Sequence, residues 1–509
     1  MPTLREHWLV PDAPFVSYAE YRAATGPSAV EKARALAPQS LLREIALSGL
    51  RGRGGAGFPA GTKWGAVAAS ECPTRYVVCN AAEGEPGTFK DRWLLAWNPY
   101  ATLEGMLVAA HAVGARVAVI ALKASAEREV ARVRAALTEL EAAGVPGGVE
   151  VRVALGPDEY LFGEEKALLE VISGNDPLPR SPDSPPYEVG LYPTPGSPNP
   201  AVVNNAETFA HVPGIVRAGA ASFRAVGTQD TPGTLLFTVS GDVQRPGVYE
   251  APAGTTLAHV FNVLAGGPRP GRTFKAALSG VSSRPLTPDR FDTPADFGSV
   301  KLAGSWLGSA GFVLLDDAAS MPRVVQSVAR FLYVESCNQC SACKHGLRTA
   351  SLAIDELFDA KTNTPDDIPR ALYGARSAPQ ANRCYLPVQG SVVIPAILGL
   401  WADEFEELAL DPSSAPPPWP LPKITGWDEA RRAFTYDSHA ALKKPDWTFA
   451  QPTASPRARP ATTPTDAATA AVSVRLAPDV AKSLAEDARQ RGVALDTAVN
   501  EALREWLKR

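Results

Sequence analysis

Residues 335–344 read Glu-Ser-Cys-Asn-Gln-Cys-Ser-Ala-Cys-Lys, and this stretch indicates what the last third of the chain is built to hold. Cys337, Cys340 and Cys343 are spaced so that three thiolates can surround one corner of a cubane, and the distant Cys384 supplies a fourth ligand. This three-plus-one grouping favours a [4Fe–4S] cluster. The alternatives are a structural zinc site, whose thiolates usually come as two separated pairs, and buried free cysteines. Because four of only six cysteines lie in this pattern, we expect a one-electron relay.

The composition of the 509-residue chain indicates several domains and a large core. Its formal net charge of -4 gives no global field that would attract nucleic acid or a membrane surface. The first residues do not resemble a signal peptide, and no apolar run is long enough to cross a bilayer. We therefore expect a cytoplasmic protein, with a place at the periphery of a membrane-bound complex left open. Cys79 ends an apolar stretch and is interpreted as a small core residue.

Strands and helices alternate through the first part of the chain. Apolar strands are predicted at residues 76–79 and 116–122 and an alternating strand at 149–155, with helices at 103–113 and 126–142 between them. Such an alternation predicts parallel strands joined by crossover helices. The fold class expected from it is α/β, within a chain of several domains.

Changes in the pattern divide the chain into five parts. The α/β alternation fills residues 1–232, and short strands and turns in 233–320 predict a small α+β domain. Residues 321–412 are mainly helical and hold the four cysteines of the cluster pattern. Residues 413–470 are rich in proline and alanine and are predicted to form a linker, and residues 471–509 regain order.

A glycine-rich loop, residues 50–64, is the first candidate ligand site. Its glycines permit a close approach of a ligand to the backbone, and Arg53 and Lys63 suit a phosphate. The ordinary dinucleotide fingerprint follows a strand, whereas here a helix precedes the loop, so the simple Rossmann interpretation fails. A flexible linker is the alternative, but linkers seldom combine Phe58 and Trp64 with two cations.

Three further segments carry polar side chains. Residues 80–92 follow a predicted strand at its carboxyl end, where Glu83 and Glu85 either accept from ribose hydroxyls or a carboxamide or belong to a solvated turn. Residues 160–170 open a helix whose carboxylates either face a ligand or are ordinary N-terminal acids. Paired asparagines in residues 202–208 either bind a polar ring edge or cap a helix.

In this order the segments resemble the flavoprotein subunit of respiratory complex I, a family that includes the diaphorase subunits of NAD-linked hydrogenases and formate dehydrogenases. The resemblance covers roughly residues 30–410. It implies a Rossmann-like FMN-binding domain that also binds NADH, then a β-grasp domain of the SLBB type, then a helical bundle with one [4Fe–4S] cluster.

The resemblance also implies roles for individual residues. In the FMN site, the phosphate and ribityl chain would meet Gly52, Arg53, Gly54, Gly55 and Lys63. The rest of the FMN pocket would come from Asn80, Tyr160, Gly163, Glu164, Asn204 and Asn205. In the NADH site, Glu85 would face the nicotinamide as the catalytic group, Phe58 would stack near the adenine, and Glu165 would approach the adenosine ribose.

The activity implied is that of an NADH dehydrogenase-type oxidoreductase. NADH or NADPH would give a hydride to FMN, and single electrons would leave through the cluster to a ferredoxin-like, other iron–sulfur or quinone-linked partner. Several residues depart from the family pattern, mainly around NADH: Ala66, Ala82, Lys166 and Ser184. One alternative is therefore an electron-transfer protein that no longer binds NADH.

The tail, residues 471–509, resembles a ribbon-helix-helix module. Such modules dimerise through a strand and present it to the major groove of DNA. Arg475 is a single positive charge on the predicted strand, which is little for binding DNA. We therefore favour a dimerisation or docking appendage. A redox-sensing regulator that uses the tail to read DNA is a third interpretation of the whole chain.

Overall fold

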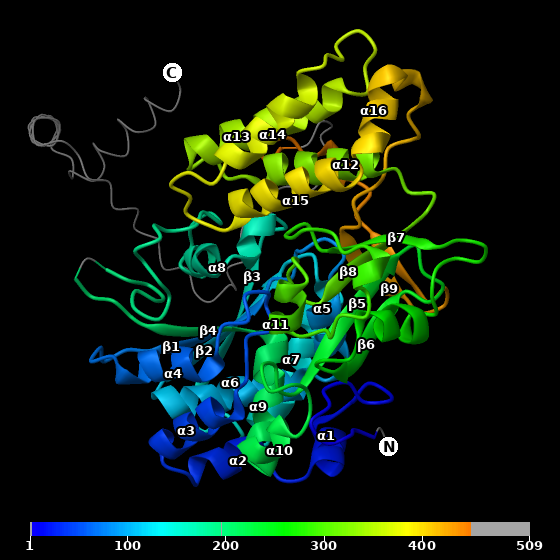
Figure 1. Ribbon diagram of the computed structural model, residues 1–509. Helices are drawn as coiled ribbons and strands as arrows, with labels where there is room; N and C mark the ends of the chain where they lie inside the picture. Colours follow the sequence, from blue (N-terminus) through cyan, green and yellow to red (C-terminus); the bar gives the residue numbers. More distant parts are fainter. Residues whose placement is uncertain (1–2, 195, 449–509) are drawn as a thin grey trace, which may run out of the picture. The chain divides into compact units, whose positions relative to one another are not determined.

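The computed structural model describes residues 3–194 and 196–448 (Figure 1). The ribbon-helix-helix module expected at residues 471–509, and with it the questions of a homodimer and of DNA binding, lies outside these residues. The same holds for residues 449–470 of the expected linker. The multidomain α/β class is confirmed by the two four-stranded sheets and the helical bundle that follow each other along the chain.

The first sheet consists of four parallel strands in the order β3-β2-β1-β4. They are β1 (Tyr76–Ala81), β2 (Val117–Lys123), β3 (Glu150–Gly156) and β4 (Ala201–Asn205). The strand order reverses at β1, since β2 lies on one side of it and β4 on the other. A ligand crevice is expected outside the carboxyl ends of the strands at such a point. Asn80 and Asn205 are paired in register there.

Helices cover both faces of this sheet. Alternate residues of β1 and β2 pack on the larger group of helices, and the intervening ones, such as Val78 and Val119, pack on α8. Gly105 of α6 allows α9 to approach, because a Cβ there would lie 1.9 Å from the Phe209 carbonyl oxygen. The helices of this region are α1 (Tyr18–Thr25), α2 (Ala29–Arg34), α3 (Pro38–Ser48), α4 (Ala60–Ala69), α5 (Lys90–Trp97), α6 (Pro99–Val113), α7 (Glu127–Ala142), α8 (Glu165–Ile172), α9 (Ala206–Ala218) and α10 (Ala220–Arg224).

The second sheet is mixed, with the order β6-β5-β8-β7. Strands β5 (Thr234–Gly241) and β8 (Gly311–Asp316) are parallel, whereas β6 (Gly247–Pro252) and β7 (Phe274–Ser279) are antiparallel to their neighbours. Phe237, Phe261 and Phe312 fill its core against η2 (His259–Leu264) and α11 (Phe297–Leu302). This is the small α+β unit that the sequence predicts after residue 233.

Five helices follow and lie side by side (Figure 1). They are α12 (Met321–Glu335), α13 (Ser341–Glu356), α14 (Asp367–Ser377), α15 (Leu386–Leu400) and α16 (Ala402–Leu410). Gly346 and Gly374 let α13 and α14 touch, since a Cβ on Gly346 would lie 2.6 Å from the Gly374 carbonyl oxygen. Among the described helices, none alone is long and apolar enough to span a membrane; the bent pair α15 and α16 reaches that length and composition together.

The structure differs from the expected linker over residues 413–448. There β9 (Ile424–Asp428) and β10 (Ala433–Tyr436) form an antiparallel hairpin, which we call the C-terminal hairpin. Its Trp427 and Phe434 pack against Trp93 and Phe89 of the first domain, with ring centroids 5.4 and 5.7 Å apart. The surrounding prolines hid these two short strands from sequence analysis. Aromatic contacts over a long sequence separation hold the hairpin in place.

Candidate functional site

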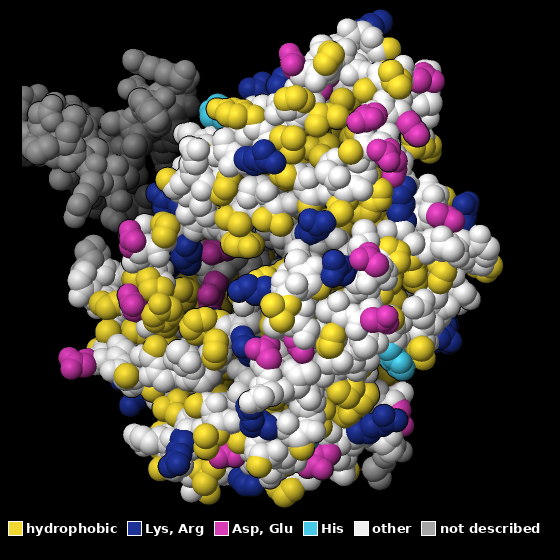
Figure 2. All heavy atoms as spheres, in the orientation of Figure 1, with side chains coloured by type: hydrophobic (Ala, Val, Ile, Leu, Met, Phe, Trp, Pro, Cys, Tyr) yellow, Lys and Arg dark blue, Asp and Glu magenta, His cyan; other side chains and the backbone are white. Residues whose placement is uncertain are grey.

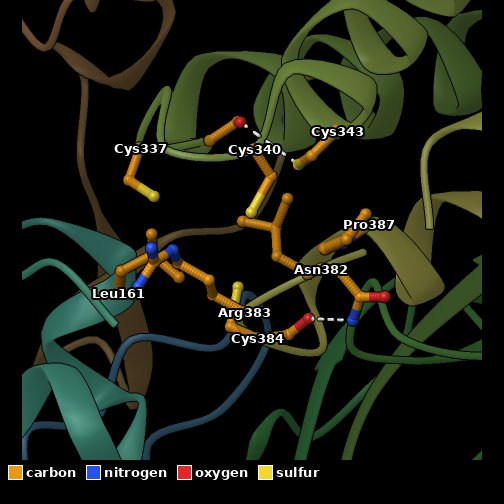
Figure 3. A pocket seen from close by; sticks show the side chains of 10 residues that line it. Leu161, Cys337, Cys340, Cys343, Asn382, Arg383, Cys384 and Pro387 are labelled. Atoms are coloured by element: carbon orange, nitrogen blue, oxygen red, sulfur yellow. Dashed lines mark hydrogen bonds between the residues drawn. The ribbon is translucent and has the colours of Figure 1, made fainter. Parts of the chain in front are cut away.

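The four cysteines of the predicted cluster surround one narrow cavity (Figure 3). Cys337 and Cys340 come from the turn between α12 and α13, Cys343 from the first turn of α13, and Cys384 from the segment before α15. No disulfide joins any of them. Leu161, from the first domain, closes the cavity on one side.

The donor set bears on the two metal alternatives. A structural zinc site usually takes its four thiolates as two separated pairs. Here three thiols come from one turn and the start of α13, and the fourth comes from the segment before α15. Such a three-plus-one set around one cavity fits a [4Fe–4S] cluster.

Polar side chains lie next to the cysteines or hold the chain that carries them. Ser336 Oγ lies 3.3 Å from Cys343 Sγ, and Gln339 Nε2 lies 3.6 Å from Cys337 Sγ. Burial raises the pKa of Cys343 to about 11, so its thiolate needs the positive charge of iron. Lys166, which replaces a threonine of the family pattern, donates to the Arg383 carbonyl (2.6 Å) and holds the segment that carries Cys384.

The glycine loop forms a closed turn beside the carboxyl end of β4. Gly52 N donates to the Phe58 carbonyl (2.8 Å), and the Gly55 carbonyl accepts from Trp306 Nε1 of the second domain (3.1 Å). A Cβ on Gly54 would lie 3.2 Å from Asn205 Cβ, so the loop approaches the strand end more closely than most residues would allow. The result is a backbone cradle at the crevice of the first sheet.

Two cations stand at this cradle. Arg53 is buried, its guanidinium donates to the Pro232 carbonyl (2.6 Å), and its Nε has no partner within the described residues. Burial lowers the pKa of Arg53 to about 10, which leaves it charged at neutral pH. Lys63 Nζ donates to the Val203 carbonyl (2.7 Å) and pairs with Glu165. A buried guanidinium with its Nε unpaired, beside a second cation and backbone amides, fits a phosphate.

The remaining predicted FMN residues lie at or near the carboxyl ends of the same strands. Asn80 donates to the Gly163 carbonyl (2.8 Å), which fixes the turn before α8. Asn204 accepts from Trp64 Nε1 (2.9 Å). Glu164 caps α8 by accepting from the amides of Lys166 and Ala167, and burial raises the pKa of its carboxyl to about 7. The structure thus gathers these residues, with Asn205, at the strand ends.

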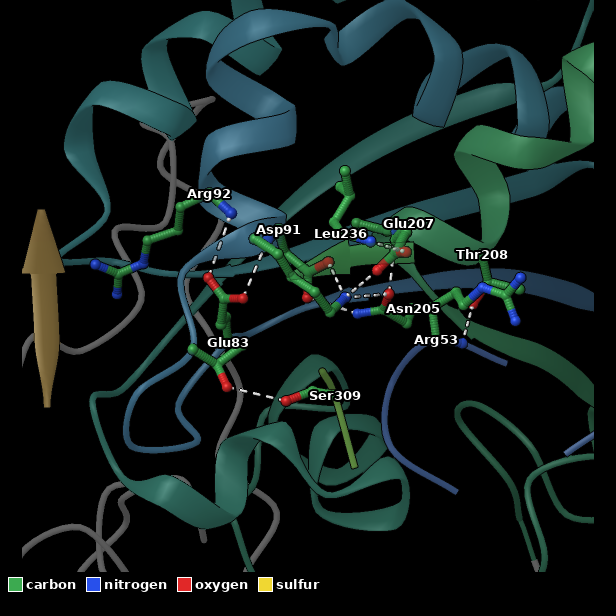
Figure 4. A network of polar contacts seen from close by, with 12 residues as sticks. Arg53, Glu83, Asp91, Arg92, Asn205, Glu207, Thr208, Leu236 and Ser309 are labelled. Carbon is green, nitrogen blue, oxygen red and sulfur yellow. Dashed lines mark hydrogen bonds and ion pairs between the residues drawn. The ribbon is translucent and has the colours of Figure 1, made fainter. Parts of the chain in front are cut away.

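Glu83 has a structural task in addition to its predicted ligand role (Figure 4). Its two oxygens accept from the amides of Asp91 (3.0 Å) and Arg92 (3.3 Å) and so cap the start of α5. Burial and the nearby Asp91 raise the pKa of Glu83 to about 7. Glu83 therefore holds the loop between β1 and α5 in its conformation.

A buried ionic group beside Glu83 escaped sequence analysis (Figure 4). Lys90 Nζ lies 2.9 Å from Asp91 Oδ1 and 2.7 Å from Glu207 Oε2, and it donates to Asn205 Oδ1 (3.2 Å). Asn205 also caps α9 by accepting from the Glu207 amide (3.0 Å). Asn205 thus caps a helix, which is one of the two roles that the sequence left open for it. The position of Lys90 in the sequence gave no indication of its distant partner Glu207.

The residues predicted for NADH come from the loop after β1, the glycine loop and the start of α8. Glu85 is half-buried, accepts from Tyr160 Oη (2.5 Å) and from the amide of Val281 (2.8 Å), and burial raises its pKa. Phe58 is 46% exposed, with Lys63 Nζ 6.0 Å from its ring centroid. Glu165 is engaged by Lys63, so the structure couples a predicted ribose ligand to a predicted phosphate ligand.

Family models match this chain in three places: the Nuo51 FMN-binding domain at residues 45–214, the SLBB domain at 236–281, and the NADH-ubiquinone oxidoreductase-F iron–sulfur binding region at 323–408. All three follow the order that the sequence predicts.

Similar proteins agree with these matches. An F subunit of NADH-quinone oxidoreductase in Rhizobium meliloti is 38% identical over 356 residues, which are 68% of this chain and 83% of that protein. The corresponding protein of Aquifex aeolicus is 34% identical, over 68% of this chain and 81% of that protein. A crystal structure of an NAD+-reducing [NiFe]-hydrogenase in the H2-reduced state superposes with a TM-score of 0.69 at 33% identity, covering 77% of this chain and 67% of that one.

Proposed function

Since this chain belongs to the F-subunit family of the NADH-quinone oxidoreductases, we infer that it oxidises NADH with FMN and one [4Fe–4S] cluster and passes electrons to partner proteins. One observation carries this function. Tyr160 contacts Glu85 in the nucleotide crevice, and the next residue, Leu161, lines the cysteine cavity. A single turn of chain therefore separates the two sites, which is the proximity that electron transfer needs.

The residues that would hold FMN are those of the cradle and the crevice. Arg53, Lys63 and the loop amides suit its phosphate, and Asn80, Gly163 and the strand-end asparagines suit its polar ring edge. When bound, FMN takes up a hydride and gives back its electrons singly, and the cluster carries one electron at a time. The protein supplies binding, orientation and charge.

The carboxylates supply the nucleotide side of the site. Glu85 keeps part of its surface open, and from there it can accept a hydrogen bond from a carboxamide or a ribose hydroxyl. Glu165 can accept from ribose hydroxyls only while it shares or releases Lys63. We assign Glu85 to the nicotinamide end of NADH and Glu165 with Phe58 to the adenosine end.

A second candidate function, electron transfer without NADH, rests on one observation. Phe58 is exposed, and Ala66 stands where an aromatic of the family pattern would face the adenine. Losing one stacking partner weakens adenine binding by about 1 kcal/mol, which lowers affinity roughly fivefold. That loss reduces NADH binding without abolishing it, so NADH oxidation remains our first proposal.

The acceptor that we propose is a ferredoxin-like or other iron–sulfur subunit, in an assembly peripheral to the cytoplasmic side of a membrane. The similar proteins are named as parts of quinone oxidoreductases, which supports a partner that carries electrons onward. On the face shown in Figure 2, Lys and Arg side chains alternate with Asp and Glu side chains. A partner would therefore be chosen by fit rather than by a strong field of one sign.

Anaerobic titration of the purified protein with NADH, and separately with NADPH, tests the function. We expect NADH to bleach the flavin absorbance and to produce the electron paramagnetic resonance (EPR) signal of a reduced [4Fe–4S] cluster. Flavin that dithionite reduces but neither nucleotide does would contradict the proposal and establish the second candidate.

A further inference from the structure

The hydroxyl of Tyr160 has neighbours from two different domains. Tyr160 begins the short helix η1 (Tyr160–Gly163), and its hydroxyl donates to Glu85 Oε2 (2.5 Å). On its other side stands Gln389, whose Nε2 lies 2.9 Å and Oε1 3.3 Å from the same oxygen. Gln389 is buried and lies on α15, the helix that follows Cys384. Sequence analysis gave Gln389 no role.

The geometry allows one consistent set of hydrogen bonds. A phenol has a single proton, so when Tyr160 donates to Glu85 its oxygen is left as an acceptor. The amide of Gln389 then donates to that oxygen through Nε2, the closer of its two polar atoms. A donor placed there keeps the phenol proton directed at Glu85, and bonds in such a chain strengthen each other.

Glu85 depends on this support because it has few other partners. The amide of Val281 donates to its second oxygen (2.8 Å). Gly280 has φ +56, and a Cβ there would lie 2.2 Å from Glu85 Oε1, so the turn is shaped around the carboxylate. Lys123 Nζ approaches the adjacent Gly84, and near Tyr160 stand the thiol of Cys384 and the carboxylate of Glu335, which accepts from the Tyr160 amide (3.1 Å).

We propose that Gln389 is a positioning residue for NADH oxidation: it holds the Tyr160 hydroxyl toward Glu85 and so fixes the carboxylate that meets the nicotinamide. This proposal rests on the proposed function. It makes α15, a helix of the cluster domain, part of the nucleotide site. The hydrogen bonds run from Gln389 through Tyr160 to Glu85, and the same helix begins beside a cluster ligand.

Two substitutions separate donation from packing. Gln389→Leu removes both polar atoms, and Gln389→Met removes them while keeping the length of the side chain. We expect both variants to raise the KM for NADH roughly three- to tenfold with little change in kcat, because the bond to the nucleotide exists in ground and transition states alike. Loss of the donated bond should also shift the acidic limb of the pH profile of kcat/KM to higher pH. Ser391→Ala, whose hydroxyl bonds only the Val388 carbonyl of the same helix, is the matched control.

A double-mutant cycle tests the route of the effect. In a Tyr160→Phe background, the Gln389 substitutions should add nothing further to KM. An equal rise in KM with and without the Tyr160 hydroxyl, or an unchanged KM in both Gln389 variants, would overturn the proposal. The EPR signal of the dithionite-reduced cluster reports whether each variant is folded and loaded.

The same experiment keeps the two proposals apart. A wild-type protein whose flavin NADH does not bleach overturns the proposed function and this inference together. A wild-type protein that is bleached, beside Gln389 variants that behave like Ser391→Ala, overturns the inference alone.

Discussion

Lys443 Nζ lies 2.8 Å from Glu335 Oε2, and both side chains are buried. This ion pair joins the chain that follows the C-terminal hairpin, residues 437–448, to the last turn of α12, two residues before Cys337. We call the hairpin together with these residues the C-terminal hairpin segment. Glu335 also accepts from the amide of Tyr160 (3.1 Å). One carboxylate thus connects the hairpin segment, the cluster helix and the nucleotide domain.

Replacing one partner of this pair should destabilise the protein strongly. Lys443→Met leaves the Glu335 carboxylate buried without its cation, which costs about 3–5 kcal/mol. We expect the midpoint of thermal unfolding to fall by several degrees. A double replacement, Lys443→Met with Glu335→Gln, should recover part of the loss, and a double variant as unstable as Lys443→Met would contradict this account.

The fourth cysteine should be needed for the cluster. Cys384→Ser removes a thiolate ligand, so we expect lower iron and sulfide content and loss or broadening of the cluster EPR signal. Cys79→Ser is the control, because Cys79 is buried in the first sheet away from the cavity. Equal iron content in both variants would show that Cys384 is not a ligand.

Lys63 should govern FMN affinity. Lys63→Ala removes a cation from the cradle and leaves Glu165 unpaired beside the expected phosphate. Losing one charge-assisted contact should raise the Kd for FMN about 10- to 100-fold, measured by the quenching of flavin fluorescence on binding to the apoprotein. Lys361→Ala, at an exposed lysine, serves as control. An FMN affinity equal in the two variants would contradict the assignment of Lys63 to the FMN phosphate.

The buried Lys123 should give stability a distinct pH dependence. It is 2% exposed and has no ion-pair partner within the described residues, and burial, followed by the nearby Lys423, lowers its pKa to about 7. Above that value the folded amine is neutral while the unfolded one still holds a proton up to about pH 10.5. The free energy of unfolding therefore rises with pH across this window, by up to about 1.4 kcal/mol per unit.

Denaturant unfolding at pH 7.5 and 9.5 measures this effect. The wild-type protein should gain stability over that range relative to Lys123→Met, which lacks the titrating group. Lys444→Met, an exposed lysine, should follow the wild type. Parallel pH profiles for wild type and Lys123→Met would refute the assigned titration.

Local patterns were enough to predict much of the fold. The strands β1 and β2 are largely apolar runs, and β3 alternates apolar and polar residues; lying between amphipathic helices, they indicated parallel strands. Strand β4 escaped prediction because its five residues end in two asparagines, which resemble a loop. The C-terminal hairpin escaped because its stability comes from Trp93 and Phe89, far away in sequence.

The candidate site also has parts that could be predicted from the sequence and parts that could not. The spacing of the cysteines and the glycines is local, so sequence analysis could identify both. The second task of Glu83, the partner of Lys90 and the contact between Gln389 and Tyr160 depend on chain segments that meet only in the folded protein. Periodicity and spacing in the sequence carry no information about such long-range contacts.

The position of the C-terminal hairpin segment has a consequence for biosynthesis. Lys344, next to Cys343, donates to the Pro445 carbonyl (2.7 Å), and Trp447 Nε1 donates to the Val334 carbonyl (3.0 Å). These contacts form only after the ribosome has released residues 445–447, well after all four cysteines have emerged. During translation the cysteine turn is thus still uncovered, and a scaffold that delivers iron and sulfide would meet an open site. Residues 445–447 can therefore cover the cysteine turn only late in synthesis.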